Sequence, residues 1–249
     1  MERVAGAVVG SAVGDALGAP FEFGSPGAFS TRFPTPDAGV EMCGGGGWDT
    51  GEATDDTQMA IHVAESLLEY GGLNLPDIFT RFQRWAADDP KDIGPRTEDV
   101  LTRGLPWDQA ATAHYRTSHR AAGNGSLMRA TPSAVYFAAD GRQATMDAAR
   151  RIAALTHGDP AAWEGTAIFH DLVRLALSGA DPLKELSQTL AAVHPHFPGS
   201  RASSPLPGGV GAGRERVRAD VAPGRLTSIG VEVGDCSAPV SDSQVWESG

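Results

Sequence analysis

Residues 54–70 read TDDTQMAIHVAESLLEY, and this stretch has the features of an amphipathic helix with a marked start and a marked end. Thr54 suits the N-cap position, and the two carboxylates after it suit the positive end of the helix dipole. Apolar side chains then recur at helical spacing: Met59, Val63, Leu67 and Leu68. Two glycines follow Tyr70 and act as a stop signal. The stretch predicts a helix from Asp55 to Tyr70 with one buried face.

Helical periodicity also occurs on both sides of this stretch. Residues 3–17 carry apolar side chains at helical spacing, with glycine at every fourth position from Gly6 to Gly18. This pattern predicts a buried helix with a ridge of small residues that another backbone approaches closely. Further helices are expected over residues 76–85, 98–103, 127–137, 144–156, 161–178 and 182–193. Sustained alternation with a period of two is absent, so the expected fold class is all-α.

Composition narrows the class of protein. The chain of 249 residues has 31 Asp and Glu against 20 Lys and Arg, so its formal charge of −11 argues against non-specific binding to nucleic acid. Its two cysteines are far apart, and they favour a reducing compartment and a cytoplasmic location. The apolar N-terminus carries Glu2 near its start and Asp15 within it, which is unlike a secretory signal or a membrane span. We therefore expect a soluble protein that has no membrane partner.

The chain changes character near residue 200. Residues 1–199 are expected to form the helical domain. Residues 200–249 contain eight Gly, eight Ser, four Pro and a single aromatic residue, Trp246. Such a segment buries too little apolar surface to offset the entropy of ordering it, which predicts a disordered tail. A reading-frame disruption that replaced the original C-terminus is the alternative explanation.

Thr54, Asp55 and Asp56 allow two interpretations. They can simply cap the helix and complement its dipole. Alternatively, a hydroxyl and two carboxylates on one rigid turn can form half of a site for a hard cation such as Mg²⁺, which prefers oxygen ligands. The residues alone leave both interpretations open.

The segment Gly123-Asn124-Gly125 also has two interpretations. Asn-Gly is typical of a tight turn, which is the default. Glycines just before a helix can instead expose backbone N–H groups to a phosphate, and a helix is expected from residue 127.

Three further side chains are candidates for either a structural or a functional role. His157, between Thr156 and Gly158, is either a structural histidine or part of a binding site. Glu22 lies between two phenylalanines and is either solvent-exposed or a carboxylate with a raised pKa beside a site. Asp15 needs a partner if it is buried, and a supporting role, such as capping a helix, is expected for it.

Four stretches in this order resemble the ADP-ribosylglycohydrolase family, which includes the dinitrogenase-reductase-activating glycohydrolases. They are residues 10–23 (GSAVGDALGAPFEF), 54–60 (TDDTQMA), 123–129 (GNGSLMR) and 156–160 (THGDP). The resemblance covers roughly residues 1–197. It implies a compact orthogonal bundle of helices, a centre of two Mg²⁺ ions below an ADP-ribose cleft, and hydrolysis of the bond between ADP-ribose and a modified side chain.

The resemblance also implies roles for individual residues. Thr54, Asp55 and Asp56 would be metal ligands, and Asp55 or Asp56 would orient the attacking water or accept its proton. Glu22 would be a mobile carboxylate near the scissile bond. The remaining positions would contact the bound ADP-ribose: Gly94, Gly123, Asn124, Gly125 and His157. The expected partner is an ADP-ribosylated protein or a small molecule that contains ADP-ribose.

The sequence departs from the family pattern near its C-terminus. The family completes its metal centre with a Gly-Asp-x-Asp-Thr segment, and the most similar fragment here is residues 234–237 (GDCS). The second half of the metal site is therefore not found. The absence of the helix that would carry it should leave apolar surface uncovered on the remaining helices. Two functions stay open: an ADP-ribosyl hydrolase, or a non-catalytic ADP-ribose-binding module or inactive truncated homologue.

Overall fold

The computed structural model describes residues 2–35, 41–118 and 122–193. Within these ranges the chain is helical, and an isolated β-bridge joins Gly45 and Trp48. The α-helices in chain order are α1 (Glu2–Gly18), α2 (Ala28–Arg32), α3 (Asp55–Tyr70), α4 (Leu75–Ala87), α5 (Pro95–Thr102), α6 (Ala110–Thr117), α7 (Thr131–Phe137), α8 (Arg142–Ala153), α9 (Pro160–Ser178) and α10 (Pro182–Val193). Short 3₁₀ turns are η1 (Ala19–Phe21), η3 (Asn124–Ser126) and η4 (Ala138–Asp140). The all-α prediction is confirmed.

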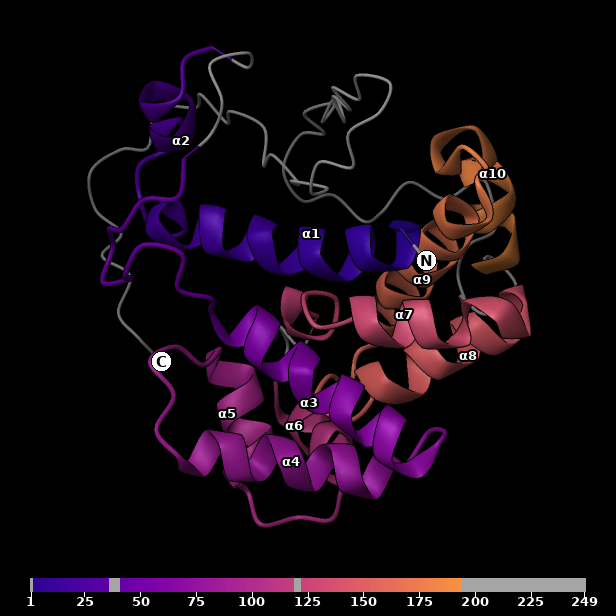
Figure 1. Ribbon diagram of the computed structural model, residues 1–249. Coiled ribbons are helices and arrows are strands. Elements are labelled where there is room, and N and C mark those ends of the chain that lie inside the picture. Colours follow the sequence, from indigo (N-terminus) through magenta and orange to yellow (C-terminus); the bar gives the residue numbers. More distant parts are fainter. Residues whose placement is uncertain (1, 36–40, 119–121, 194–249) are drawn as a thin grey trace, which may run out of the picture.

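The helices form two groups that α1 crosses (Figure 1). The helices α3 to α6 gather on one side, and α7 to α10 gather on the other. The helix α1 packs against α3, α7 and α9, so it joins the two groups. This arrangement brings together the C-terminal end of α1 and the N-terminal ends of α3 and α5, which are distant from one another in the sequence.

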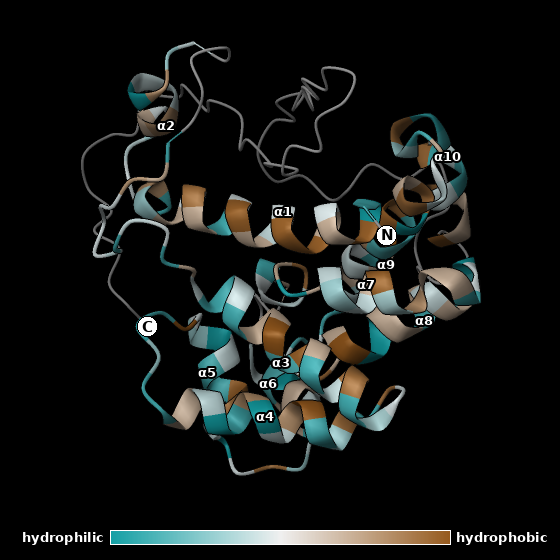
Figure 2. Ribbon diagram, viewed as in Figure 1, coloured by the Kyte–Doolittle hydropathy of each residue, from teal (hydrophilic) through white to brown (hydrophobic). Residues whose placement is uncertain are grey.

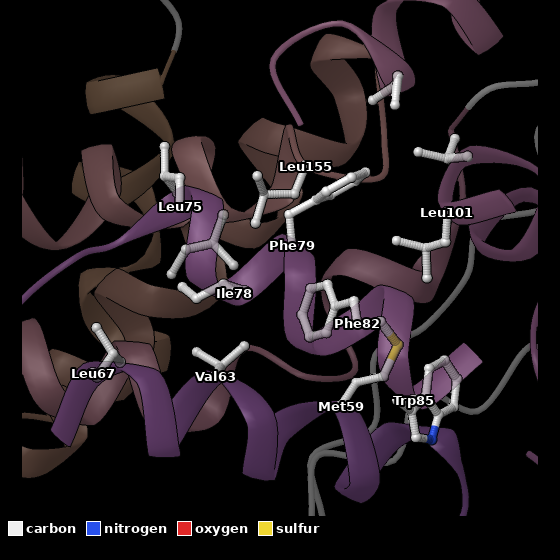
Figure 3. Close-up of a cluster of buried hydrophobic side chains, with 14 residues drawn as sticks. Met59, Val63, Leu67, Leu75, Ile78, Phe79, Phe82, Trp85, Leu101 and Leu155 are labelled. Carbon is white, nitrogen blue, oxygen red and sulfur yellow. The ribbon is translucent and has the colours of Figure 1, made fainter. Parts of the chain in front are cut away.

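The main hydrophobic core lies between α3 and α4 (Figure 3). Met59, Val63 and Leu67 of α3 are buried against Ile78 and Phe82 of α4. The buried face of α3 repeats at helical spacing, as the sequence predicts. Leu68 was expected on this face, and that expectation is wrong because its side chain is 76% exposed. It lies one residue beyond Leu67, which turns it about 100° away from the core.

The start and end of α3 follow their predicted signals. The Thr54 side chain accepts a hydrogen bond from the Asp56 backbone N–H, as an N-cap residue does. Gly71 ends the helix in the left-handed conformation, with φ of 63°. The predicted bounds, Asp55 to Tyr70, are confirmed.

The prediction that the first helix is buried is wrong. Ala16 is the one buried residue that α1 contains, and four of its valines are exposed: Val4, Val8, Val9 and Val13. A Cβ atom on Gly10 or Gly18 would have no described atom within 4 Å, so no close backbone accounts for these two glycines. Hydrophobic residues therefore recur along a helix whose outer face stays open (Figure 2).

The sequence-based expectation that no segment could span a membrane is not supported by the first helix. Residues 2–21 have the length and mean hydropathy of a membrane span, and 11% of an 18-residue window in this segment is buried. In the structure the same helix packs against three others, and its Asp15 is bound to α3.

Other boundaries differ from the predictions. A helix was expected from Leu127, but η3 and a turn come first, and α7 begins at Thr131 with Pro132 in its first turn. Proline suits that position because its missing N–H is not needed there. The helices α2 and α6 were not expected. The proposed tail, residues 200–249, and the fragment at 234–237 lie outside the described residues.

Candidate active site

Asp15 fastens the end of α1 to the start of α3. Its carboxylate accepts hydrogen bonds from the backbone N–H and the hydroxyl of Thr54, at 3.0 and 2.8 Å. It also accepts from the backbone N–H and the hydroxyl of Thr57, at 3.2 and 2.6 Å. Asp15 therefore has the supporting, helix-capping role that the sequence suggested. These four bonds fix the turn that carries the two neighbouring aspartates.

Asp55 and Asp56 sit on this turn in surroundings that oppose their ionisation. Burial, followed by the negative charges of Asp92 and Asp15, raises the pKa of Asp55 to about 6. Burial, followed by the charges of Asp55, Asp15, Glu22 and Asp92, raises the pKa of Asp56 to about 7. Helix capping alone would lower these values, so burial and the neighbouring carboxylates together outweigh the effect of the helix terminus.

Glu22 and Asp92 complete the acidic cluster, which we define as Asp15, Glu22, Asp55, Asp56 and Asp92. Glu22 follows η1 and has an exposed side chain. Partial desolvation and the charges of Asp92, Asp55 and Asp15 raise its pKa. Glu22 thus combines the two interpretations that the sequence left open, because its side chain is exposed and its pKa is raised. Asp92 lies in the loop between α4 and α5.

The acidic cluster has little cationic compensation. Among the described residues, neither Asp55 nor Asp56 forms an ion pair with Arg or Lys, and the buried Arg129 acts on Asp55 only through its field. Carboxylate and hydroxyl oxygens are the donors that Mg²⁺ prefers, so the chemistry of this set fits that ion. The described part of the chain does not, however, hold three or more His, Cys, Asp or Glu side chains in an arrangement able to bind a metal ion.

The predicted glycine segment lies against His157 and α5. A Cβ atom on Gly123 would overlap Nη1 of Arg96 and lie 3.5 Å from Nε2 of His157. A Cβ atom on Gly125 would lie 3.0 Å from Cε1 of His157 and 3.1 Å from Oγ1 of Thr97. Glycine at both positions therefore lets the side chains of Arg96, Thr97 and His157 lie directly against this segment. The glycine segment and His157 come together as the resemblance implied.

Asn124 and Gly94 have simpler positions. The carbonyl of Asn124 accepts bonds from the backbone N–H groups of Leu127 and Met128, so this residue forms the turn η3. Gly94 is the N-cap of α5, and a Cβ atom there would lie 4.0 Å from Oγ1 of Thr97. The turn interpretation of Asn124 is thus correct, while the phosphate argument from a helix beginning at Leu127 does not apply.

Arg129 connects the two parts of the site. Its side chain is fully buried and crosses the face of Phe82, 4.6 Å from the ring centre. It donates hydrogen bonds to the carbonyl of Gly125 and to Oγ1 of Thr156, and it contacts Sδ of Met59 on α3. Desolvation lowers its pKa to about 9, and the charge of Asp55 opposes that shift.

Three charged residues of this region were not predicted from the sequence: Asp92, Arg96 and Arg129. All three lie within two stretches that contain predicted site residues, residues 92–97 (DIGPRT) and 123–129. A charged residue within a glycine-bearing loop was the available signal. Two surface hollows, one between Tyr70 and Trp107 and one between Glu2 and Leu177, are not lined by any predicted site residue.

Comparison with known proteins supplies the family. The ADP-ribosylglycohydrolase family model matches residues 1–234. The chain is 36% identical to ADP-ribosyl-(dinitrogen reductase) glycohydrolase of Rhodospirillum rubrum over 138 residues, which is 54% of this chain and 44% of the relative. It is 27% identical to ADP-ribosylarginine hydrolase Tri1 of Pseudomonas putida (strain GB-1) over 209 residues, 78% of this chain and 52% of the relative.

A solved structure is also similar. A chain of an ADP-ribosylglycohydrolase-related protein complex matches with a TM-score of 0.57 and 37% identity, over 78% of this chain and 62% of that one. This chain spans about half the length of the curated relatives described above. The family match covers most of the sequence and includes all four stretches that suggested it, so this chain belongs to the ADP-ribosylglycohydrolase family.

Proposed function

We propose that this chain hydrolyses the glycosidic bond between ADP-ribose and a modified side chain, with ADP-ribosylated arginine as the first substrate to test. The observation that carries the proposal is the juxtaposition of the uncompensated acidic cluster with the segment formed by Gly123, Gly125 and His157. Arg129 joins them, because it bonds to the glycine segment and acts on Asp55. The name of the Pseudomonas putida relative, an ADP-ribosylarginine hydrolase, supports arginine as the linked residue.

Thr54, Asp55 and Asp56 would hold Mg²⁺. Burial, followed by the charges of neighbouring carboxylates, raises the pKa values of the two aspartates, and a bound cation would offset both effects. When bound, Mg²⁺ supplies positive charge that orients ribose hydroxyls and makes a water more acidic. Asp15 would keep its four hydrogen bonds and hold the turn in place.

The carboxylates of Asp55 and Asp56 would accept the proton of the attacking water. Asp55 or Asp56 accepts that proton while the water oxygen bonds to C1″ of the ribose and the bond to the modified side chain breaks. The departing side-chain atom keeps the electron pair of that bond, and the carboxyl group then gives its proton to the released side chain or to solvent water. Carboxylates are among the side chains that accept a proton from a positioned water molecule. Glu22, exposed at the end of η1, would lie beside the scissile bond.

The second half of the site would bind the diphosphate and the ribose. Glycine at residues 123 and 125 lets the side chains of Arg96 and His157 pack directly against this backbone, which would form one wall of the binding site. Arg96 brings a positive charge to the same segment, where its Nη1 donates to the carbonyl of Ala122 at 3.0 Å. A guanidinium group suits a diphosphate because it offers several N–H donors and a permanent charge.

A second function, ADP-ribose binding without hydrolysis, also has a specific observation in its favour. The described residues do not form a complete metal-binding cluster, and the chain matches about half the length of the relatives. Binding through Arg96, His157 and the glycine segment needs fewer groups than catalysis does.

One pair of measurements separates the two functions. ADP-ribose is titrated calorimetrically into the full chain with Mg²⁺ and again with excess chelator, and release of ADP-ribose from an ADP-ribosylated arginine peptide is followed. The hydrolase predicts binding and release that both weaken with chelator and with the Asp55→Asn plus Asp56→Asn variant. Binding without release would favour the binding module. A folded chain that does neither would contradict both.

A further inference from the structure

Arg129, Thr156 and His157 form an ordered chain of hydrogen bonds. Nη2 of Arg129 donates to Oγ1 of Thr156 at 2.6 Å, and Oγ1 of Thr156 lies 2.9 Å from Nδ1 of His157. All three side chains are buried, with exposed fractions of 0%, 1% and 2%. Buried polar groups need partners, and Nε of Arg129 is a donor in this group that has none among the described residues.

The direction of each bond follows from which groups can donate. Arginine has donors and no acceptor, so Oγ1 of Thr156 must accept from Arg129. The hydroxyl proton of Thr156 then needs an acceptor, and Nδ1 of His157 is the acceptor within reach. Nδ1 therefore carries no proton, and the proton of the neutral imidazole is on Nε2.

The opposite direction would be costly. If Nδ1 donated to Thr156, Oγ1 would accept two hydrogen bonds and its own buried proton would have no acceptor among the described residues. Leaving a buried donor unsatisfied costs about 1–3 kcal/mol. A positively charged ring is also disfavoured, because burial and then the charges of Arg129, Arg96 and His114 lower the pKa of His157 to about 3.

The proton on Nε2 is directed toward the glycine segment. Nε2 lies 3.5 and 3.3 Å from the positions of Cβ atoms built on Gly123 and Gly125. It has no hydrogen-bond acceptor among the described residues, so this form also leaves one proton without a protein partner, and an oxygen atom of a ligand would supply the acceptor that the hydroxyl proton of Thr156 finds in Nδ1. A second bond from Arg129, to the carbonyl of Gly125 at 2.5 Å, fixes this segment relative to the same guanidinium. One side chain thus sets both the proton on His157 and the position of the glycines that face it.

We propose that Arg129 and Thr156 are positioning residues that hold His157 as a neutral Nε2–H donor toward an oxygen atom of a ligand bound over Gly123 and Gly125. This inference rests on the proposed function for the identity of the ligand, which is ADP-ribose. A neutral donor is directional, and it adds no further positive charge beside Arg96. We call the hydrogen bonds from Arg129 through Thr156 to His157 the relay. Through the relay, two residues that do not touch the ligand determine which ring nitrogen of His157 carries the proton.

The relay is tested first without ligand, by the ¹⁵N spectrum of the histidine rings in the full chain. Two-bond proton–nitrogen correlations show which ring nitrogen carries the proton, and His157→Gln identifies the signal. The expected result is a single Nε2–H form at neutral pH. An Nδ1–H form, or a mixture of both forms, in the unsubstituted chain would overturn the proposal.

Matched variants of Thr156 test the direction of control. Thr156→Val keeps the shape and removes the hydroxyl, so the ring should lose its single form, whereas Thr156→Ser should retain it. A valine variant with an unchanged histidine spectrum would overturn the relay. The serine variant and the unsubstituted chain keep the test decisive if the valine variant does not fold.

The same variants are then titrated with ADP-ribose. Loss of one hydrogen bond to a correctly held donor should weaken binding by about tenfold in Thr156→Val and leave Thr156→Ser near the unsubstituted value. Equal affinities of all three chains would overturn the link between the relay and binding. A fixed Nε2–H form in a chain that does not bind ADP-ribose would instead contradict the proposed function and leave the relay supported.

Discussion

Two groups of carboxylates in this protein differ in their partners. On α9, the fully buried Asp171 accepts hydrogen bonds from Arg142, Arg174 and Thr189, at 3.0, 2.7 and 2.6 Å. Glu164, on the same helix, binds Arg150 through both of its oxygens at 2.8 Å. In the acidic cluster, by contrast, Asp55 and Asp56 repel each other and have no ion-pair partner among the described residues.

The difference separates carboxylates that stabilise the fold from carboxylates that await a ligand. A buried charge is tolerated when opposite charges and hydrogen bonds surround it, as on α9. Carboxylates gathered without cations cost stability, and such clusters with shifted pKa values are typical of functional sites. The predictions below test this distinction, beginning with the largest expected effect.

Removing a paired carboxylate should destabilise the protein most. Asp171→Ala leaves Arg142, Arg174 and Thr189 without their shared acceptor, so the free energy of unfolding should fall by about 3 kcal/mol. Urea unfolding measures the change. A loss smaller than that of an exposed control, Asp181→Ala, would show that the α9 pairs contribute nothing to the fold.

Neutralising the unpaired cluster should have the opposite sign. Asp56→Asn removes a charge whose pKa the fold raises to about 7, so the unfolding free energy at pH 8 without divalent ions should rise by about 1–2 kcal/mol. The matched change on α9, Asp171→Asn, should lower it. Two variants that change stability in the same direction would remove the contrast between the regions.

Arg96 should matter to the ligand more than to the fold. Arg96→Ala removes the positive charge beside Gly123 and should weaken ADP-ribose binding by about tenfold, or about 1.4 kcal/mol, in calorimetry. Arg103→Ala, at the other end of α5, is the control and should bind as the unsubstituted chain does. Identical affinities of the two variants would exclude Arg96 from the site.

Acid should weaken the packing of α9 by a smaller amount. Burial lowers the pKa of His170 to about 4, so below pH 6.5 the unfolded chain binds a proton that the folded chain does not. Stability should therefore fall as pH falls, by about 1 kcal/mol between pH 6.5 and 5.5, until the pH approaches 4. Urea unfolding across this range should show a smaller decline for His170→Gln, and an equal decline would assign the effect to other groups.

The sequence predicts the parts of this structure that depend on local signals. The bounds of α3 follow from Thr54 and Gly71, whose capping roles are set by their immediate neighbours. The burial of Met59, Val63 and Leu67 follows from helical spacing. The role of Asp15 was anticipated because a carboxylate on an apolar helix needs donors.

The sequence fails where an outcome depends on distant residues. Nothing local shows that the outer face of α1 stays open, since its apolar spacing is that of a buried helix. Asp92 gains its importance from Asp55, which is 37 positions earlier in the chain. The link from Arg129 to Thr156 and His157 likewise exists only once α7 and the loop after α8 are packed.

The most direct test of the distinction between the two groups is thermal unfolding of the full chain and of its Asp55→Asn plus Asp56→Asn variant, with and without Mg²⁺ and ADP-ribose. Without Mg²⁺, the variant should have the higher Tm, because it lacks the repulsion between the two charges. Mg²⁺ with ADP-ribose should raise the Tm of the unsubstituted chain and leave that of the variant unchanged. A variant that is less stable than the unsubstituted chain, and that responds equally to Mg²⁺ and ADP-ribose, would show that these aspartates are structural.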